Sequence, residues 1–265
     1  MTLAVALGMV IGLVMALTGA GGGVLAVPLL VFGLHLPVQQ ATPVGLVAVG
    51  LAATLGAALG LRQRMVRYRA AALMGVAGML MAPVGVFMAQ RLPGRPLLGA
   101  FALVLIYTAW RMLKRPALAV PLPAAVLCRV NSTDQRLTWT LPCARALAGT
   151  GLFAGLLSGL LGVGGGFVII PALTRYTDLG IRSIQVTSLA VIALVSLSGV
   201  AAAAVHGPLR WDLALPFASG AVLALLAGQQ VAGKLNAKSL QQAFAWLSLL
   251  VAVIMLARAF GWVAN

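Results

Sequence analysis

Acidic side chains are almost missing from this chain. Its 265 residues include three acidic residues, all of them aspartates, against 18 lysines and arginines, and charged residues make up only 8% of the total. A soluble domain carries about a quarter charged residues, so this scarcity excludes an ordinary soluble domain. None of the aspartates lies inside a long apolar run, so the carboxylates that usually carry protons or cations through a membrane are missing too.

Several groups that support catalysis are also missing. No phosphate-binding loop of the GxxxxGK[ST] type occurs, and no His/Cys/Asp cluster has the spacing of a metal site. Cys128 and Cys143 fit neither a metal-ligand spacing nor a disulfide framework, so we expect free thiols. These absences predict a protein that is not an enzyme and needs no cofactor.

The N-terminal residues 1–23 superficially resemble a secretory signal. They lack the positively charged start that such a signal needs, and the same pattern recurs at 155–166. We therefore expect this segment to belong to the mature protein.

Long apolar runs are what the chain does contain. Hydrophobic residues make up 62% of it, and the mean hydropathy is +1.08. Six runs near the ~20 residues that a membrane-spanning helix needs lie at 41–61, 70–89, 97–113, 186–205, 213–232 and 240–257. The sequence therefore predicts an all-α polytopic membrane protein. Its net charge of +15 then belongs to loops facing lipid headgroups, not to a nucleic-acid surface.

Two glycine clusters interrupt the apolar sequence, TGAGGGVLAVP at 18–28 and GVGGGFVIIP at 162–171. Gly162 follows Gly19, and Pro171 follows Pro28, by the same 143 residues. Glycine destabilises a helix interior by about 1 kcal/mol relative to alanine, so three in a row indicate a point where a helix stops. We predict a helix break at membrane depth in each cluster.

The same offset relates much of the remaining chain, for example Gly12 to Gly155 and Gly85 to Gly228. It indicates a first transmembrane repeat at 1–114, a linker at 115–145 and a second repeat at 146–265. Each repeat should contain a glycine-broken helical hairpin, or a pair of short helices, followed by three transmembrane helices. Because three is odd, the repeats would be inverted, which is a common plan of secondary transporters.

Loop charges predict the orientation of these spans in the cell (inner or plasma) membrane. Four arginines lie between the first two full spans, at 62–69, and further basic residues lie in the linker. Basic loops face the cytoplasm. We therefore expect a cytoplasmic linker, with the N-terminus and the C-terminus outside.

The glycine breaks are the first candidate binding site for a small anion. Helix N-termini that follow them would present free N–H groups and a positive dipole end, and glycine allows close approach. The alternative is that the glycines let the two hairpins pack tip to tip. The candidate residues are Gly19, Gly21, Gly22, Gly23, Gly162, Gly164, Gly165 and Gly166.

Polar residues that follow the breaks extend this candidate site. Gln40 and Thr42 begin one span, and Gln185, Thr187 and Ser188 begin its counterpart. Their amides and hydroxyls could donate hydrogen bonds to an oxyanion, or the hydroxyls could cap helices.

A second polar feature lies deeper in the second half. Gln229 and Gln230 fall within an expected span. At that depth we expect them either to line the transport pathway or to form hydrogen bonds between helices.

The pattern G-L-x-x-x-L-x-G-x-G-G-G-x-x-x-x-P, followed by Q-x-T, occurs in both halves. It is carried by Gly12, Leu13, Leu17, Gly19, Gly21, Gly22, Gly23 and Pro28, and again by Gly155, Leu156, Leu160, Gly162, Gly164, Gly165, Gly166 and Pro171. This duplication resembles the TauE/SafE family of membrane permeases over nearly the whole chain, the linker excepted. The resemblance implies a transporter, often an exporter, of sulfite, sulfonates or related organosulfur anions.

We therefore expect a secondary transporter that exports a small oxyanion by alternating access. An anion channel with the same glycine-lined site, a cation exporter and a non-transporting membrane subunit are the alternatives. The sequence leaves open whether the chain forms a homodimer.

Overall fold

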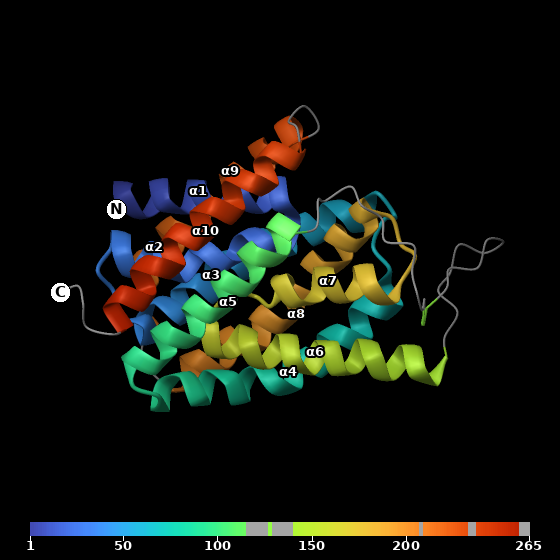
Figure 1. The fold of residues 1–265 in the computed structure, drawn as a ribbon, viewed down its shortest axis with the longest axis horizontal. Helices are drawn as coiled ribbons and strands as arrows, with labels where there is room; N and C mark the ends of the chain where they lie inside the picture. Colours follow the sequence, from blue (N-terminus) through green and yellow to red (C-terminus); the bar gives the residue numbers. More distant parts are fainter. Residues whose placement is uncertain (115–126, 129–139, 207–208, 233–236, 260–265) are drawn as a thin grey trace.

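The computed structural model describes residues 1–114, 127–128, 140–206, 209–232 and 237–259, and every regular element within these ranges is a helix (Figure 1). In chain order the elements are α1 (Thr2–Thr18), the 3-10 segment η1 (Gly19–Leu25), α2 (Ala26–Gly33), α3 (Val38–Arg62), α4 (Tyr68–Arg91), α5 (Gly94–Lys114), α6 (Leu141–Leu161), α7 (Gly166–Tyr176), α8 (Ile181–His206), α9 (Trp211–Ala232) and α10 (Ala237–Ala259).

Seven of the described helices are long and apolar enough to cross a membrane: α3, α4, α5, α6, α8, α9 and α10. Six of them contain the six apolar runs, so those predicted spans are confirmed. The seventh, α6, has 21 residues, and at 1.5 Å per residue it covers about 31 Å. It is therefore longer than the short helix that the sequence predicted before the second glycine cluster.

The start of α6 explains this difference. Thr140 caps the helix by accepting a hydrogen bond from the backbone N–H of Cys143 at 3.3 Å, and Pro142 occupies the first turn. Proline is tolerated there because the first N–H groups have no helical partner. The expected linker, 115–145, therefore ends earlier, because residues from Leu141 onward are helical.

Close helix packing joins the two halves of the chain. Gly8 and Gly12 of α1 contact backbone atoms of Phe217 and Ala221 of α9. In the same way Gly151 and Gly155 of α6, which follow those glycines by 143 residues, contact backbone atoms of Met74 and Gly78 of α4. Side chains at these positions would push the helices apart, so glycine permits the close approach. Figure 1 shows α1 beside α9 and α6 beside α4.

Figure 1 also places the start of α1 and the end of α10 at the same end of the molecule, on the left, while α6 begins on the right.

The two cysteines form a disulfide between Cys128 and Cys143, so the prediction of free thiols was wrong. Their Cα atoms lie 5.3 Å apart although 15 residues separate them in sequence. The backbone brings them together, because the N–H of Cys128 donates to the carbonyl of Tyr176 at 3.0 Å and Thr140 Oγ1 donates to the carbonyl of Leu127 at 3.3 Å. Such contacts with α7 and the start of α6 leave no sequence signature.

Candidate functional site

Both glycine clusters interrupt helices, as the sequence predicts, but they do so with different backbones. The first cluster, which includes Gly19, Gly21, Gly22 and Gly23, tightens into the 3-10 segment η1 between α1 and α2. In the second cluster Gly162, Gly164 and Gly165 adopt left-handed φ values of 71°, 76° and 70°, and Gly166 begins α7. An L-residue pays about 1–2 kcal/mol in this conformation, so the second break depends on glycine.

The two breaks meet in the interior of the protein. A Cβ atom added to Gly23 would lie 2.9 Å from the carbonyl oxygen of Val163, and one added to Gly162 would lie 2.6 Å from the carbonyl oxygen of Thr42. Gly45 approaches the carbonyl of Gly162 in the same manner, at 3.1 Å. The second break therefore packs against the first break and against α3, the long helix that follows the first break in sequence.

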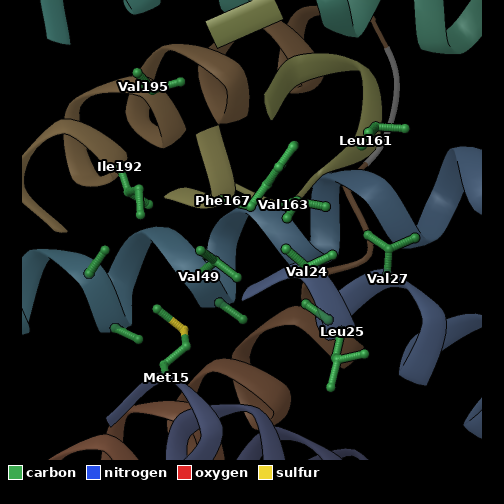
Figure 2. Close-up of a cluster of buried hydrophobic side chains, with 14 of the residues drawn as sticks. Met15, Val24, Leu25, Val27, Val49, Leu161, Val163, Phe167, Ile192 and Val195 are labelled. Carbon is green, nitrogen blue, oxygen red and sulfur yellow. The ribbon is translucent and has the colours of Figure 1, made fainter. Parts of the chain in front are cut away.

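Apolar side chains fill the space around the meeting point (Figure 2). An added Cβ on Gly164 would lie 2.7 Å from Ile192 Cγ2 and 2.8 Å from Val49 Cγ1, and Met15 and Val163 are fully buried in the same cluster. In this conformation the glycines serve tip-to-tip packing, and an anion reaches their backbone only if these side chains move apart.

The N-terminus of α7 supplies the donors at this point. Its N-cap residue is Gly165, and no side chain caps the helix. The N–H groups of Val168 and Ile169 both donate hydrogen bonds to the carbonyl of Gly165, at 3.0 Å and 3.3 Å. The first N–H groups of a helix have no intrahelical partner and form its positive end. α2 also starts without a side-chain cap, at Leu25.

Two buried serines near the breaks were missed by the sequence analysis. Ser158 and Ser196 are 0% and 1% exposed, and their hydroxyls have no hydrogen-bond partner among the described residues. Ser158 lies in the last turn of α6, where its carbonyl accepts from the N–H of Gly162 at 2.8 Å. Ser196 contacts Gly50 on α3, beside Val49. A hydroxyl four residues before a glycine cluster, in the otherwise apolar stretch 151–161, was the available signal for Ser158.

The polar residues predicted beside the breaks are dispersed. Thr42 contacts the second break, but its Oγ1 donates to the carbonyl of Val38 at 2.9 Å. Thr187 Oγ1 accepts from the N–H of Arg67 at 3.1 Å, at the start of α4, and Ser188 Oγ donates to the carbonyl of Gln185 at 2.7 Å. Thr42 and Ser188 therefore donate to carbonyls within their own helices, and Thr187 accepts from another segment, so none of the three hydroxyls caps its own helix.

Two of the four predicted glutamines, Gln40 and Gln185, have described side chains. Gln40 is exposed at the start of α3, and Gln185 is partly buried on α8. The side chains of Gln229 and Gln230, at the end of α9, lie outside the described residues. The neighbouring Gly228 packs against Ala16 of α1, two residues before the end of that helix.

Known proteins resemble the chain over most of its length. Residues 4–255 match the family model described as "Sulfite exporter TauE/SafE". Probable membrane transporter proteins from two strains of Xylella fastidiosa are each 27% identical over 257 residues, which cover 96% of this chain and 94% of the relative. The probable membrane transporter protein YunE of Bacillus subtilis is 24% identical over 249 residues, 89% of this chain and 90% of the relative.

No solved structure matches the chain significantly. The family match spans both halves of the chain and both glycine breaks. The chain therefore belongs to the sulfite exporter TauE/SafE family and is a multi-pass membrane transporter, not an enzyme.

Proposed function

We propose that this transporter exports a small oxyanion, such as sulfite or a sulfonate, through a binding site at the meeting point of the two glycine breaks. The observation that carries the proposal is the combination of an uncapped helix N-terminus at Gly165 with the buried, unpaired hydroxyls of Ser158 and Ser196. Each group can donate a hydrogen bond, and a helix N-terminus favours negative charge.

The charge distribution supports an anion over a cation. Two of the three aspartates, Asp178 and Asp212, lie in the described part, at the loop before α8 and in the first turn of α9. Neither is near the middle of a span. Among the described residues, a cation at the breaks would find only neutral ligands, namely backbone carbonyls and hydroxyl oxygens, whereas an anion gains N–H and O–H donors.

Alternating access requires two arrangements of the halves around one site. Reciprocal packing supports inverted repeats: α1 lies on α9 and α6 on α4, through glycines that share the 143-residue offset. Rocking of one repeat against the other would separate Val49, Ile192 and Met15 and expose the breaks to one side at a time. The apolar packing shown in Figure 2 is then the closed state, and it favours a carrier over an open channel.

The proposed orientation puts the linker in the cytoplasm of a bacterial cell and both termini outside, in the inner membrane. With this arrangement all but four of the 18 lysines and arginines face the cytoplasm, the exceptions being Arg91, Arg95, Arg210 and Arg258. Such an asymmetry is the usual determinant of orientation.

The membrane potential can drive the proposed export. Moving one negative charge out of a cytoplasm-negative cell gains about 2.3 kcal/mol per 100 mV, equivalent to about 50-fold accumulation outside. No coupling ion is required for this direction, which agrees with the scarcity of carboxylates. All groups of the proposed site come from one chain, so a homodimer is not needed and stays a separate prediction.

A ligand panel read by thermal unfolding tests the anion class. The purified transporter is heated with sulfite, sulfate, a short alkyl sulfonate, a short carboxylate or a quaternary ammonium ion, each as a matched salt. A ligand present at 100 times its Kd stabilises the protein by about 2.7 kcal/mol. We expect stabilisation by sulfite or the sulfonate only. Stabilisation by the cation alone would contradict the proposal.

A further inference from the structure

Helices α5, α6 and α7 enclose a groove of about 690 Å³ that has no part in the proposed transport chemistry. One stretch of its wall is apolar and is formed by Leu103, Val104, Phe153, Leu157, Phe167 and Val168. Leu103 is 65% exposed and Phe153 is 55% exposed. Both lie in the middle of membrane-spanning helices, so these exposed surfaces face the hydrocarbon of the bilayer. The groove therefore opens toward lipid.

The other end of the groove is basic. Arg111, Arg145 and Arg175 line it together with Tyr107 and Tyr176. Arg111 lies in the last turn of α5 and Arg175 in the last turn of α7, whereas Arg145 lies near the start of α6, so all three arginines are close to helix ends.

None of these arginines is neutralised within the described part of the chain. The ion pair found there joins Arg210 to Asp212, at 2.8 Å in the α8–α9 region. Arg111 Nη1 donates to the hydroxyl of Tyr107 at 2.9 Å, which holds its guanidinium on the groove wall. Three guanidinium groups around one opening create a strong attraction for a phosphate group.

We propose that the groove binds one anionic phospholipid from the cytoplasmic leaflet. Its phosphate contacts the three arginines, and an acyl chain lies along Leu103, Phe153 and Leu157. A free oxyanion would use only the basic end, and a zwitterionic lipid would bring a cation next to the guanidinium groups. A lipid with net negative charge can place its headgroup at the basic end and its acyl chain along the open apolar wall.

The bound lipid would contact the transport machinery. Phe167 lines the groove and also belongs to the buried cluster at the breaks (Figure 2). It is the second residue of α7, directly after Gly166. The bound acyl chain therefore packs on the helix whose N-terminus faces the second break, although the proposed binding does not depend on which substrate is moved.

Native mass spectrometry of the full chain in detergent tests this proposal. The protein is titrated with phosphatidylglycerol and, separately, with phosphatidylcholine of the same acyl chains. We expect one phosphatidylglycerol per chain with an affinity at least tenfold above that of phosphatidylcholine. Each arginine near the headgroup contributes about fivefold to the affinity. Arg145→Gln and Arg175→Gln should each cause a loss of that size.

A variant that fills the groove separates a lipid from a free anion. A Cβ added to Gly149, on the groove wall, meets no atom within 4 Å, so Gly149→Leu extends into open space without disturbing a helix contact. It should abolish the adduct while the three arginines remain. Arg95→Gln, at the opposite end of α5, and Gly99→Leu, also with open space at its Cβ, are the matched controls and should bind normally.

Equal binding of phosphatidylcholine would overturn the proposal, as would unchanged binding by Gly149→Leu. Competition by glycerol phosphate at the concentration of the lipid would also overturn it, because that result would assign the arginines to a free anion.

Discussion

Replacing Gly162 by alanine should destabilise the protein strongly, because this residue is held by its own backbone conformation and by the backbone of another helix. Its φ of 71° costs an alanine about 1–2 kcal/mol. The new Cβ would lie 2.6 Å from the carbonyl oxygen and 2.8 Å from the Cα of Thr42. Backbone atoms cannot rotate away as a side chain can, so overpacking adds about 1–3 kcal/mol. The free energy of unfolding should fall by about 2–5 kcal/mol.

The helix that ends at Gly162 supplies a matched control. Gly149 lies inside this helix, α6, and a Cβ there meets nothing within 4 Å. Gly149→Ala should therefore stabilise the helix, by about 1 kcal/mol. The two variants make the same chemical change, one inside α6 and one at its end, but should shift stability in opposite directions.

Thermal unfolding in detergent, followed by the fluorescence of the five tryptophans, measures this difference. With about 2–4 °C per kcal/mol for a domain of this size, Gly162→Ala should lower the Tm by roughly 4–20 °C while Gly149→Ala raises it by a few degrees. If Gly162→Ala unfolds at the temperature of Gly149→Ala, the second break is not packed against α3 and the site described here is wrong.

Three further predictions concern the packing, the site and the linker. Gly155→Val would place a side chain against the backbone of Gly78, so the yield of folded protein after detergent extraction should fall sharply. The control Gly149→Val should extract normally. Normal extraction of both variants would contradict the close α4–α6 packing. Ser158→Ala removes an unpaired buried hydroxyl, so stability should hold or rise, but the KM for sulfite should increase about tenfold or more because a hydrogen bond to an anion is lost. An unchanged KM would remove Ser158 from the site, and Ser248→Ala, on α10 with an equally unpaired hydroxyl, is the control. The structure pairs Cys128 with Cys143, but the proposed orientation places both on the reducing, cytoplasmic side, so the disulfide should be open in intact cells and should close when isolated membranes are oxidised. Labelling of both, after reduction, by a membrane-impermeant maleimide in intact cells would place the linker outside.

The spans and breaks could be predicted because each depends on local composition. An apolar run of ~20 residues identifies a helix such as α3 or α8 without knowledge of its neighbours. Consecutive glycines indicate a break for the same reason, since they weaken the helix wherever they occur. The meeting of the two breaks was an expectation drawn from the predicted repeat, and the structure does bring Gly23 close to Val163.

The features that were missed depend on contacts between distant residues. The Cys128–Cys143 disulfide forms because backbone bonds to α7 and to Thr140 return the chain to α6. Gln40 is exposed although it begins a span, because the face of a helix that turns inward is decided by its neighbours. Pro142 was assigned to the linker, since a proline in the first turn of a helix and a proline in a loop look the same in sequence.

The most direct test of the central claim is flux through the purified transporter in proteoliposomes loaded with radiolabelled sulfite. We expect protein-dependent efflux that accelerates when a potassium gradient and valinomycin make the lumen negative and slows when they make it positive. Gly165→Leu, whose Cβ would lie 2.6 Å from the carbonyl oxygen of Ala154, should show no flux, while Gly149→Leu retains it. Normal, voltage-driven efflux by the Gly165→Leu transporter would contradict the claim that the anion passes between the glycine breaks.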